Sequence, residues 1–302
     1  MDKDIELIKD MREILLTLRR IPMYRVVKKR LLSTGITLLD VEAPAVAAKV
    51  EPGQFVIVRV DELGERIPLT VMDFDREKGT ITIVVQDVGY SSAIITRMNE
   101  GDEFQDFVGP LGVASEIENH GTVVCIGGGL GIAPIYPIAR ALKAAGNHVI
   151  SVLGSRSADL LILEDEMRAV SSEVVIATND GSAGVKGFVT DGLAQVLAQG
   201  HEVKVIWAIG PMVMMKAVVE YTRPLGIKTI VSMNPIMVDG TGMCGACRIS
   251  VGNETKFACV DGPEFDGHLV DFDLAMKRLA FYKDEENRAK ARLECDHEGG
   301  HH

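Results

Sequence analysis

The sequence has no long apolar run, few cysteines and no excess of positive charge. Its longest apolar stretch, residues 205–215, is interrupted by Gly210 and Pro211, so no segment has the length of a membrane span. Lys and Arg number 32 against 43 Asp and Glu, and this net charge of −11 argues against a nucleic-acid surface. Five cysteines, three of them within sixteen residues, are typical of a metal site and not of a disulfide framework, which indicates a reducing compartment.

The chain also has no internal repeat, no low-complexity linker and no apolar signal-peptide core near its acidic N-terminus. A cytoplasmic location is therefore expected. A length of 302 residues exceeds what one compact domain usually holds. We expect an N-terminal helical extension over residues 1–22 and three further units over residues 23–118, 119–232 and 233–302.

The N-terminal extension places five apolar residues on one helical face. These are Ile5, Ile8, Met11, Leu15 and Leu18. Two interpretations remain open. The helix packs on its own chain, or it docks a partner.

The second unit has the alternation and turn signals of a small antiparallel β-barrel. Strands are expected over residues 24–32, 36–42, 54–60, 68–74 and 80–88. A short helix over residues 91–98 should follow, with Ser91 or Ser92 as its N-cap.

The third unit alternates apolar strands with helices, which predicts a doubly wound parallel sheet. Its strands are expected over residues 122–126, 148–153, 173–177, 203–209 and 228–232. Its helices are expected over residues 133–145, 160–170, 190–199 and 211–222, and a charged helix over residues 273–293 ends the chain.

The most specific motif is Asp-x4-Cys-x2-Cys-x11-Cys, formed by Asp239, Cys244, Cys247 and Cys259. Plant-type [2Fe–2S] proteins have C-x4-C-x2-C and a more distant fourth cysteine, so Asp239 stands where the first cysteine would be. Glycines between these residues let the backbone wrap closely around sulfide. A zinc knuckle is the alternative, since C-x2-C with further ligands also suits zinc. Whether Asp239 is a ligand is left open against water or another side chain.

Candidate nucleotide-binding residues follow four strands of the predicted parallel sheet. Glycines between a strand and a helix admit a pyrophosphate to the helix N-terminus, although tight strand–helix packing also uses them. All the candidates should meet at the carboxyl edge of the sheet. They are Gly127, Gly128, Gly129, Gly131, Ser155, Arg156, Asn179, Asp180, Gly210, Pro211 and Met212.

The barrel has a second group of candidates. Arg66 could pair with a phosphate, Thr70 could hydrogen-bond a ring nitrogen, and Ser92 could hold a pyrophosphate at the start of the short helix. A surface ion pair for Arg66 and a plain N-cap for Ser92 are the alternatives. The remaining candidates here are Pro68, Leu69, Gly89 and Ser91.

A barrel, a glycine-rich sheet with the sequence GGGLGIAP at residues 127–134 and an Asp/Cys motif, in this order, resemble the ferredoxin–NADP reductase superfamily. The resemblance covers about residues 23–290 and points to the branch with a C-terminal [2Fe–2S] domain. That branch includes the electron-transfer subunit of dihydroorotate dehydrogenase B and the small subunit of electron-bifurcating transhydrogenases. Asp239 and the sequence ERIPLT at residues 65–70 are similar to the transhydrogenase subunit.

The resemblance implies FAD in the barrel, NAD(H) on the sheet and one [2Fe–2S] cluster, in an oxidoreductase subunit with Thr70 beside the reacting flavin. It also implies a larger FAD and [4Fe–4S] partner subunit, with ferredoxin reached indirectly. The superfamily's flavin motif is Arg-x-Tyr-Ser/Thr, whereas this chain has Ile67 and Leu69 in the Arg and Tyr positions and Arg66 one residue early. Arg156 would suit a 2′-phosphate and Asp159 would repel it, so NAD(H) is expected from the resemblance.

Three alternatives stay open from the sequence. The first is the electron-transfer subunit of dihydroorotate dehydrogenase B, and the second is a diaphorase subunit of a hydrogenase. The third belongs to another class, a zinc-binding interaction subunit without redox chemistry.

Overall fold

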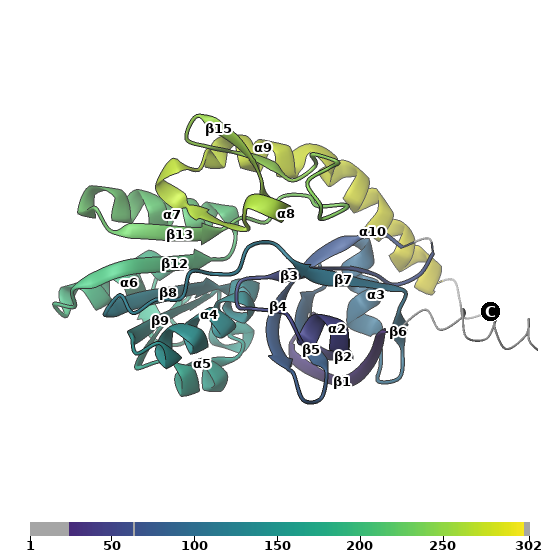
Figure 1. Cartoon of the computed structure of the whole chain (residues 1–302), viewed down its shortest axis with the longest axis horizontal. Coiled ribbons are helices and arrows are strands. Elements are labelled where there is room, and N and C mark those ends of the chain that lie inside the picture. Colours follow the sequence, from purple (N-terminus) through teal and green to yellow (C-terminus); the bar gives the residue numbers. More distant parts are fainter. Residues whose placement is uncertain (1–23, 63, 299–302) are drawn as a thin grey trace, which may run out of the picture.

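The computed structural model describes residues 24–62 and 64–298, and the predicted N-terminal helix over residues 1–22 lies outside them. Figure 1 shows the barrel beside the α/β unit, with the C-terminal segment running across the top of both. Within the described residues, no helix is long and apolar enough to cross a membrane.

The N-terminal unit is a nearly closed antiparallel sheet with the strand order β6-β1-β2-β5-β4-β3-β7. All five predicted strands are present, whereas the two short strands that complete the sheet were not predicted. Its interior is filled by inward-facing β-branched and leucine side chains, among them Leu39, Val56 and Ile81. The strands are β1 (Tyr24–Ser33), β2 (Ile36–Glu42), β3 (Phe55–Arg59), β4 (Ile67–Asp75), β5 (Thr80–Gln86), β6 (Glu103–Phe104) and β7 (Asp106–Leu111).

Two short helices accompany the barrel, α2 (Pro44–Ala47) and α3 (Tyr90–Arg97). The predicted N-cap of α3 was wrong, because Gly89 occupies that position. Ser92 lies in the first turn, where its hydroxyl oxygen accepts the backbone N–H groups of Val88 and Gly89. A serine three residues inside a helix can reach back to the cap in this way, so the sequence alone did not distinguish the two positions.

The α/β unit is a seven-stranded sheet with the order β11-β10-β9-β8-β12-β13-β16. The five predicted strands are parallel neighbours, and β16 joins the edge in the antiparallel direction. The strands are β8 (Thr122–Gly128), β9 (His148–Ser155), β10 (Glu173–Thr178), β11 (Val185–Lys186), β12 (Val203–Ile209), β13 (Lys228–Ser232) and β16 (Glu264–Asp266).

Helices cover both faces of this sheet, as the doubly wound prediction requires. Val123 and Cys125 of β8 pack toward α4 and α5, whereas Val124 and Ile126 pack toward α6 and α7. The predicted helix over residues 160–170 begins later, since Leu163 has a left-handed φ of 56°. The helices are α4 (Ile132–Ala144), α5 (Glu164–Val170), α6 (Val189–Ala198) and α7 (Met212–Thr222).

The C-terminal unit is small and shares its strand β16 with the parallel sheet. The predicted helix over residues 273–293 is two helices, because a 3-10 turn at Ala280–Tyr282 separates them. The elements are β14 (Arg248–Val251), β15 (Glu254–Phe257), α8 (Ala258–Asp261), α9 (Phe272–Leu279) and α10 (Lys283–Glu298).

Apolar cores cross the boundaries between the units. Met72 of the barrel packs in one core with the residues of α4, and Ile57 of the barrel packs in another with Cys247 and Cys259. Helix α10 returns to the barrel, where Lys290 Nζ contacts Asp87 Oδ1 at 3.2 Å (Figure 1). The three units therefore hold one another in a fixed arrangement.

Candidate functional site

The Asp/Cys motif forms a loop between β13 and β14 that turns back on itself. Gly240, Gly242 and Gly245 have φ values of 78°, 80° and 67°, the left-handed region that glycine adopts without strain. The Asp239 carboxylate accepts hydrogen bonds from the backbone N–H groups of Thr241 and Cys244, each at 3.0 Å. These bonds, the one from Thr241 first, lower the pKa of the Asp239 carboxyl, so it is ionised and directed into the loop.

The fourth predicted ligand joins the loop from a distant turn. Cys259 lies in α8, and Cys247 Sγ donates to Cys259 Sγ at 3.2 Å. Both thiols are buried, whereas Cys244 is exposed at the rim. Burial raises the pKa of the Cys259 thiol to about 12. Two buried thiols in contact form a donor set that an iron ion would stabilise in its thiolate form.

The loop is seated on the barrel. A Cβ atom at Gly240 would lie 2.7 Å from Leu111 Cδ1 and 2.9 Å from Ile57 Cδ1, so the backbone touches β7 and β3 directly. Arg66 Nε donates to the Val238 carbonyl at 3.0 Å, immediately before Asp239. The residues fit a [2Fe–2S] cluster by the chemistry of their donors. The loop carries the Asp239 carboxylate and the exposed Cys244 thiol, and the buried thiols of Cys247 and Cys259 lie in contact.

The nucleotide candidates all lie at the carboxyl edge of the parallel sheet, as the sequence predicted. Gly127 and Gly128 end β8, and a 3-10 turn over Gly129–Gly131 leads into α4. Backbone hydrogen bonds join the next two strand ends, from Asn179 N to Ser155 O and from Asp180 N to Arg156 O, each at 3.2 Å. Arg156, Asn179 and Asp180 are exposed there.

The glycines of this edge divide into two kinds. Gly131 is required for packing, because a Cβ atom there would lie 2.1 Å from the Ile209 carbonyl oxygen. Gly129 has a φ of 55° and open space around its Cβ position, so it is the glycine that a ligand can approach. Of the two candidates after Gly210 at the end of β12, Pro211 is exposed, whereas the Met212 side chain is buried in the core.

One residue of this edge was missed by the sequence analysis. The Met214 sulfur would lie 2.1 Å from a Cβ atom at Gly128 and 3.0 Å from one at Gly210, so its side chain covers both glycines. Its position in the first turn of α7, directly after Gly210-Pro211, was the available signal.

The barrel candidates lie around the N-terminus of α3 and the start of β4. Ser91 Oγ donates to Glu65 Oε2 at 2.6 Å, which joins the two segments. Thr70 is half-buried on β4 opposite Phe55 of β3, and Pro68 and Leu69 precede it on the strand. The Ser92 hydroxyl is engaged in the helix cap, and Arg66 is engaged with the cluster loop and, at 3.5 Å, with Asp106.

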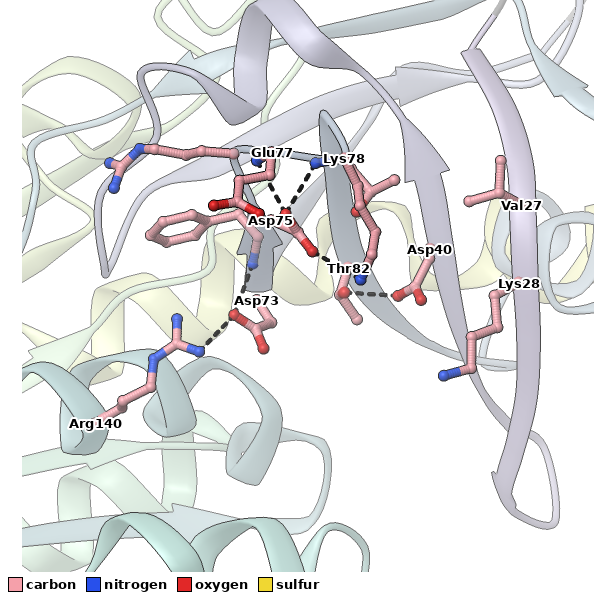
Figure 2. A pocket seen from close by; sticks show the side chains of 12 residues that line it. Val27, Lys28, Asp40, Asp73, Asp75, Glu77, Lys78, Thr82 and Arg140 are labelled. Atoms are coloured by element: carbon pink, nitrogen blue, oxygen red, sulfur yellow. Dashed lines mark hydrogen bonds and ion pairs between the residues drawn. The ribbon is translucent and has the colours of Figure 1, made fainter.

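A hollow with a volume of about 740 Å³ lies elsewhere, between the barrel and α4 (Figure 2). None of the predicted site residues lines it. Several of its polar groups pair with one another. Arg140 Nη1 lies 2.7 Å from Asp73 Oδ1, and Thr82 Oγ1 donates to Asp40 Oδ1 at 2.6 Å. We interpret this hollow as a polar joint between two units.

An antiparallel barrel, a doubly wound sheet and a cysteine loop seated on the barrel define the class, an oxidoreductase of the ferredoxin–NADP reductase superfamily. Two family models match the chain. The oxidoreductase NAD-binding domain covers residues 125–220, and the iron–sulfur cluster binding domain of dihydroorotate dehydrogenase B covers residues 234–271. The iron–sulfur interpretation of the cysteine motif is therefore confirmed over the zinc alternative.

The chain belongs to the family of dihydroorotate dehydrogenase B electron-transfer subunits and their homologues. It is 49% identical to the subunit homologue of Thermotoga maritima, over 87% of this chain and 93% of that protein. It is 36% identical to the electron-transfer subunit of Geobacillus thermodenitrificans, over 80% and 94%.

A solved structure of NADH-dependent reduced ferredoxin–NADP oxidoreductase, described for flavin-based electron bifurcation, contains a chain with a TM-score of 0.86 and 46% identity. The match covers 91% of this chain and 99% of that one. The predicted fold, enzyme class and superfamily are thus confirmed, and the predicted flavin, nicotinamide nucleotide and iron–sulfur cofactors agree with these relatives.

Proposed function

We propose that this chain is the small, NADH-reactive subunit of an electron-bifurcating transhydrogenase that couples NADH, ferredoxin and NADP. Bound FAD and a [2Fe–2S] cluster would supply the chemistry that splits a hydride into single electrons. One observation carries the proposal. The loop that contains Asp239 packs against β3 and β7, so the proposed cluster ligands lie directly on the barrel. The 46% identical relative with 99% of its chain covered supports the same assignment.

The chain's own residues have binding and positioning roles in this proposal. The open backbone at Gly129 admits the pyrophosphate of NAD(H), and Asn179 and Asp180 contact its remaining groups at the end of β10, two strands away in the sheet. Thr70 on β4 contacts the flavin ring, while the backbone around Gly89 and Ser92 holds the flavin pyrophosphate. Asp239, Cys244, Cys247 and Cys259 hold the cluster.

The partner in this proposal is a larger subunit with its own flavin and [4Fe–4S] clusters, through which ferredoxin is reached, in the cytoplasm. An electron-transfer role in dihydroorotate oxidation is the second candidate, because curated relatives with 31–36% identity have that name. A hydrogenase diaphorase is a third, supported by the resemblance alone.

The experiment has two parts. The anaerobically purified chain should show flavin and iron–sulfur absorption and should be bleached faster by NADH than by NADPH. A clear NADPH preference would reverse the nucleotide assignment, and a colourless protein after cluster and flavin reconstitution would contradict the whole proposal.

The second part identifies the reaction of the complex. The chain is co-purified with its partner subunit from the native cell and supplied with dihydroorotate and NAD, or with NADH, reduced ferredoxin and NADP. NADPH formation that requires both NADH and reduced ferredoxin supports the transhydrogenase, whereas dihydroorotate-dependent NAD reduction would replace it with the second candidate.

A further inference from the structure

A separate group of metal-ligand side chains lies on the nucleotide-binding sheet, at the edge opposite the cofactor candidates. His148 begins β9, Glu173 begins β10, and His201 lies two residues before β12. The first residues of parallel strands meet at one edge, so the fold gathers three side chains that are far apart in sequence. Among the residues that the structure describes, this is the one group of three or more His, Cys, Asp or Glu whose ligand atoms all lie within 4.8 Å of one another.

Both imidazoles approach the same carboxylate oxygen. His148 Nε2 lies 2.8 Å from Glu173 Oε1, and His201 Nε2 lies 3.7 Å from that atom. The two rings are stacked, with their centroids 5.7 Å apart and an interplanar angle of 24°. Three potential ligands thus converge on one point at the protein surface.

The backbone that carries the first histidine is fixed by a helix end. Gly146 closes α4 with a φ of 90°, and its N–H donates to the Lys143 carbonyl. The buried Asn147 side chain then donates to the Leu142 and Glu118 carbonyls. His148 follows directly, so its Cα atom is placed before any ligand binds.

The second histidine is placed in the same way. Gly200 closes α6 with a φ of 84°, and its N–H donates to the Leu197 carbonyl. His201 follows, and its own carbonyl accepts the N–H of Val203 at 3.0 Å. A site built on fixed backbone loses little conformational entropy on binding.

We propose that His148, Glu173 and His201 bind a divalent transition-metal ion, zinc by preference, with water completing the coordination. Two histidines and one glutamate are a zinc ligand set. Ligands at about 2.1 Å from a tetrahedral ion lie about 3.4 Å from one another, a value between the 2.8 Å and 3.7 Å separations present. Small side-chain rotations therefore produce the coordination geometry.

The charges around the group are compatible with a cation. Lys143 Nζ, the nearest ammonium on the preceding helix, donates to Ser172, and Lys204 is paired with Glu202. The net charge of −11 also favours cation binding over the molecule as a whole.

The ion would link β9, β10 and the segment before β12, and so stabilise the sheet. Because β9 contains eight residues, the site lies about 25 Å from the cofactor edge, at about 3.3 Å per residue. Zinc should therefore raise the melting temperature through binding to the folded state alone, and leave the rate of reduction by NADH unchanged.

The test uses the holoprotein with its cofactors bound. The sequence has further ligand-type residues near its C-terminus. The parent variant therefore carries the substitutions Cys295→Ser, His297→Asn, His301→Asn and His302→Asn. Zinc sulfate is titrated by equilibrium dialysis and calorimetry into this parent, and into His148→Ala, His201→Ala and Glu173→Gln. His120→Asn is the matched control, since His120 precedes β8 at the same edge but is not part of the group.

The parent and His120→Asn should bind one zinc ion per chain and gain melting temperature from it. Each of the three variants should bind zinc at least about tenfold more weakly. Loss of a group that only hydrogen-bonds a metal ligand can already weaken binding by that factor, and these variants each lose a ligand. Unchanged affinity in all three variants, or no binding by the parent, would overturn the proposal. Where an alanine variant loses its cofactor absorption, the glutamine variant at that position, His148→Gln or His201→Gln, is measured in its place.

Discussion

At the scale of single residues, the carboxylate of Asp239 stands in a position where related motifs have a thiolate. In the proposed cluster Asp239 would ligate iron, and because a carboxylate donates less electron density to iron than a thiolate does, this exchange should alter the cluster potential. Hard oxygen ligation favours ferric iron and lowers the potential, whereas weaker covalent donation raises it. Measuring the reduction potential of the cluster therefore decides which of the two effects is larger.

Replacing Asp239 tests its role as a ligand. Asp239→Cys should still assemble a [2Fe–2S] cluster, with a changed potential and electron paramagnetic resonance signal. Asp239→Ala should leave one iron short of a ligand, so that the cluster is lost during anaerobic gel filtration, as judged by iron content. Cys259→Ala is the control for complete loss. Native iron content, spectrum and potential in Asp239→Ala would remove Asp239 from the ligand set.

Thr70 tests the flavin contact at the same scale. Thr70→Val keeps the shape of the side chain and the pairing of β4 with β3, but removes the hydroxyl. Loss of one hydrogen bond of about 1.4 kcal/mol should slow flavin reduction by NADH about tenfold in stopped-flow measurements, with FAD content unchanged. Thr82→Val, which removes a hydroxyl bonded to Asp40 away from the site, is the control. Equal reduction rates in wild type and Thr70→Val would contradict the assignment.

At the scale of elements, the turn between β8 and α4 contains glycines with different physical requirements. A methyl group at Gly131 would meet the Ile209 carbonyl at 2.1 Å and push apart the ends of β8 and β12. Gly131→Ala should therefore cost about 1–3 kcal/mol of stability, as overpacking usually does, and should weaken NADH binding. Melting temperature and NADH titration of the same sample measure both effects.

Gly129 provides the matched control for that variant, because nothing lies within 4 Å of its Cβ position. Gly129→Ala should lose about 1 kcal/mol of stability, from the left-handed φ of 55° alone. Its main effect should be a weaker affinity for the nucleotide, because the added methyl group keeps the pyrophosphate away from the backbone. If Gly131→Ala were as stable as Gly129→Ala, the predicted clash with the Ile209 carbonyl would be wrong, because the segment at Gly131 and the end of β12 would then move apart at no cost in stability.

At the scale of the whole molecule, one partly buried carboxyl connects three units. Glu264 of β16 accepts from Ser115 Oγ at 2.6 Å and from Trp207 Nε1 at 3.2 Å, so the C-terminal unit, the segment after the barrel and the parallel sheet meet there. Burial raises the pKa of the Glu264 carboxyl. The folded protein therefore holds this proton more tightly than the unfolded chain does.

This shift makes stability depend on pH in a definite direction. Below the ordinary glutamate pKa both states are protonated, and as pH rises from there through the raised folded value, the folded state loses stability. Glu264→Gln stays neutral, so at pH 7 it avoids the cost of an ionised carboxyl in this partly buried position. Its melting temperature should therefore be roughly a few degrees higher than that of the wild type, as a small gain in the free energy of unfolding produces. The difference should vanish near pH 4. A lower melting temperature for the variant at pH 7 would contradict this account.

The predictable part of the fold came from local patterns. Strand alternation, apolar runs of parallel-sheet length and glycines after a strand are set by neighbours in the chain, so the barrel strands and the five parallel strands were found within a few residues. Helix ends were less certain, as Gly89 and the break at Ala280–Tyr282 show, because caps depend on single hydrogen bonds that several nearby residues can make.

The sequence by itself determined the cluster motif and the glycine-rich edge of the sheet, since each rests on residue types at short spacing. The class of oxidoreductase came from the resemblance that these motifs, in their order along the chain, have to a known superfamily. Only the tertiary structure decided that Arg66 bonds the backbone at Val238, that β16 joins the parallel sheet, and that His148, Glu173 and His201 meet. Arg66 and Val238 are 172 residues apart. Contacts over such distances arise from how complete elements pack, and no local pattern encodes them.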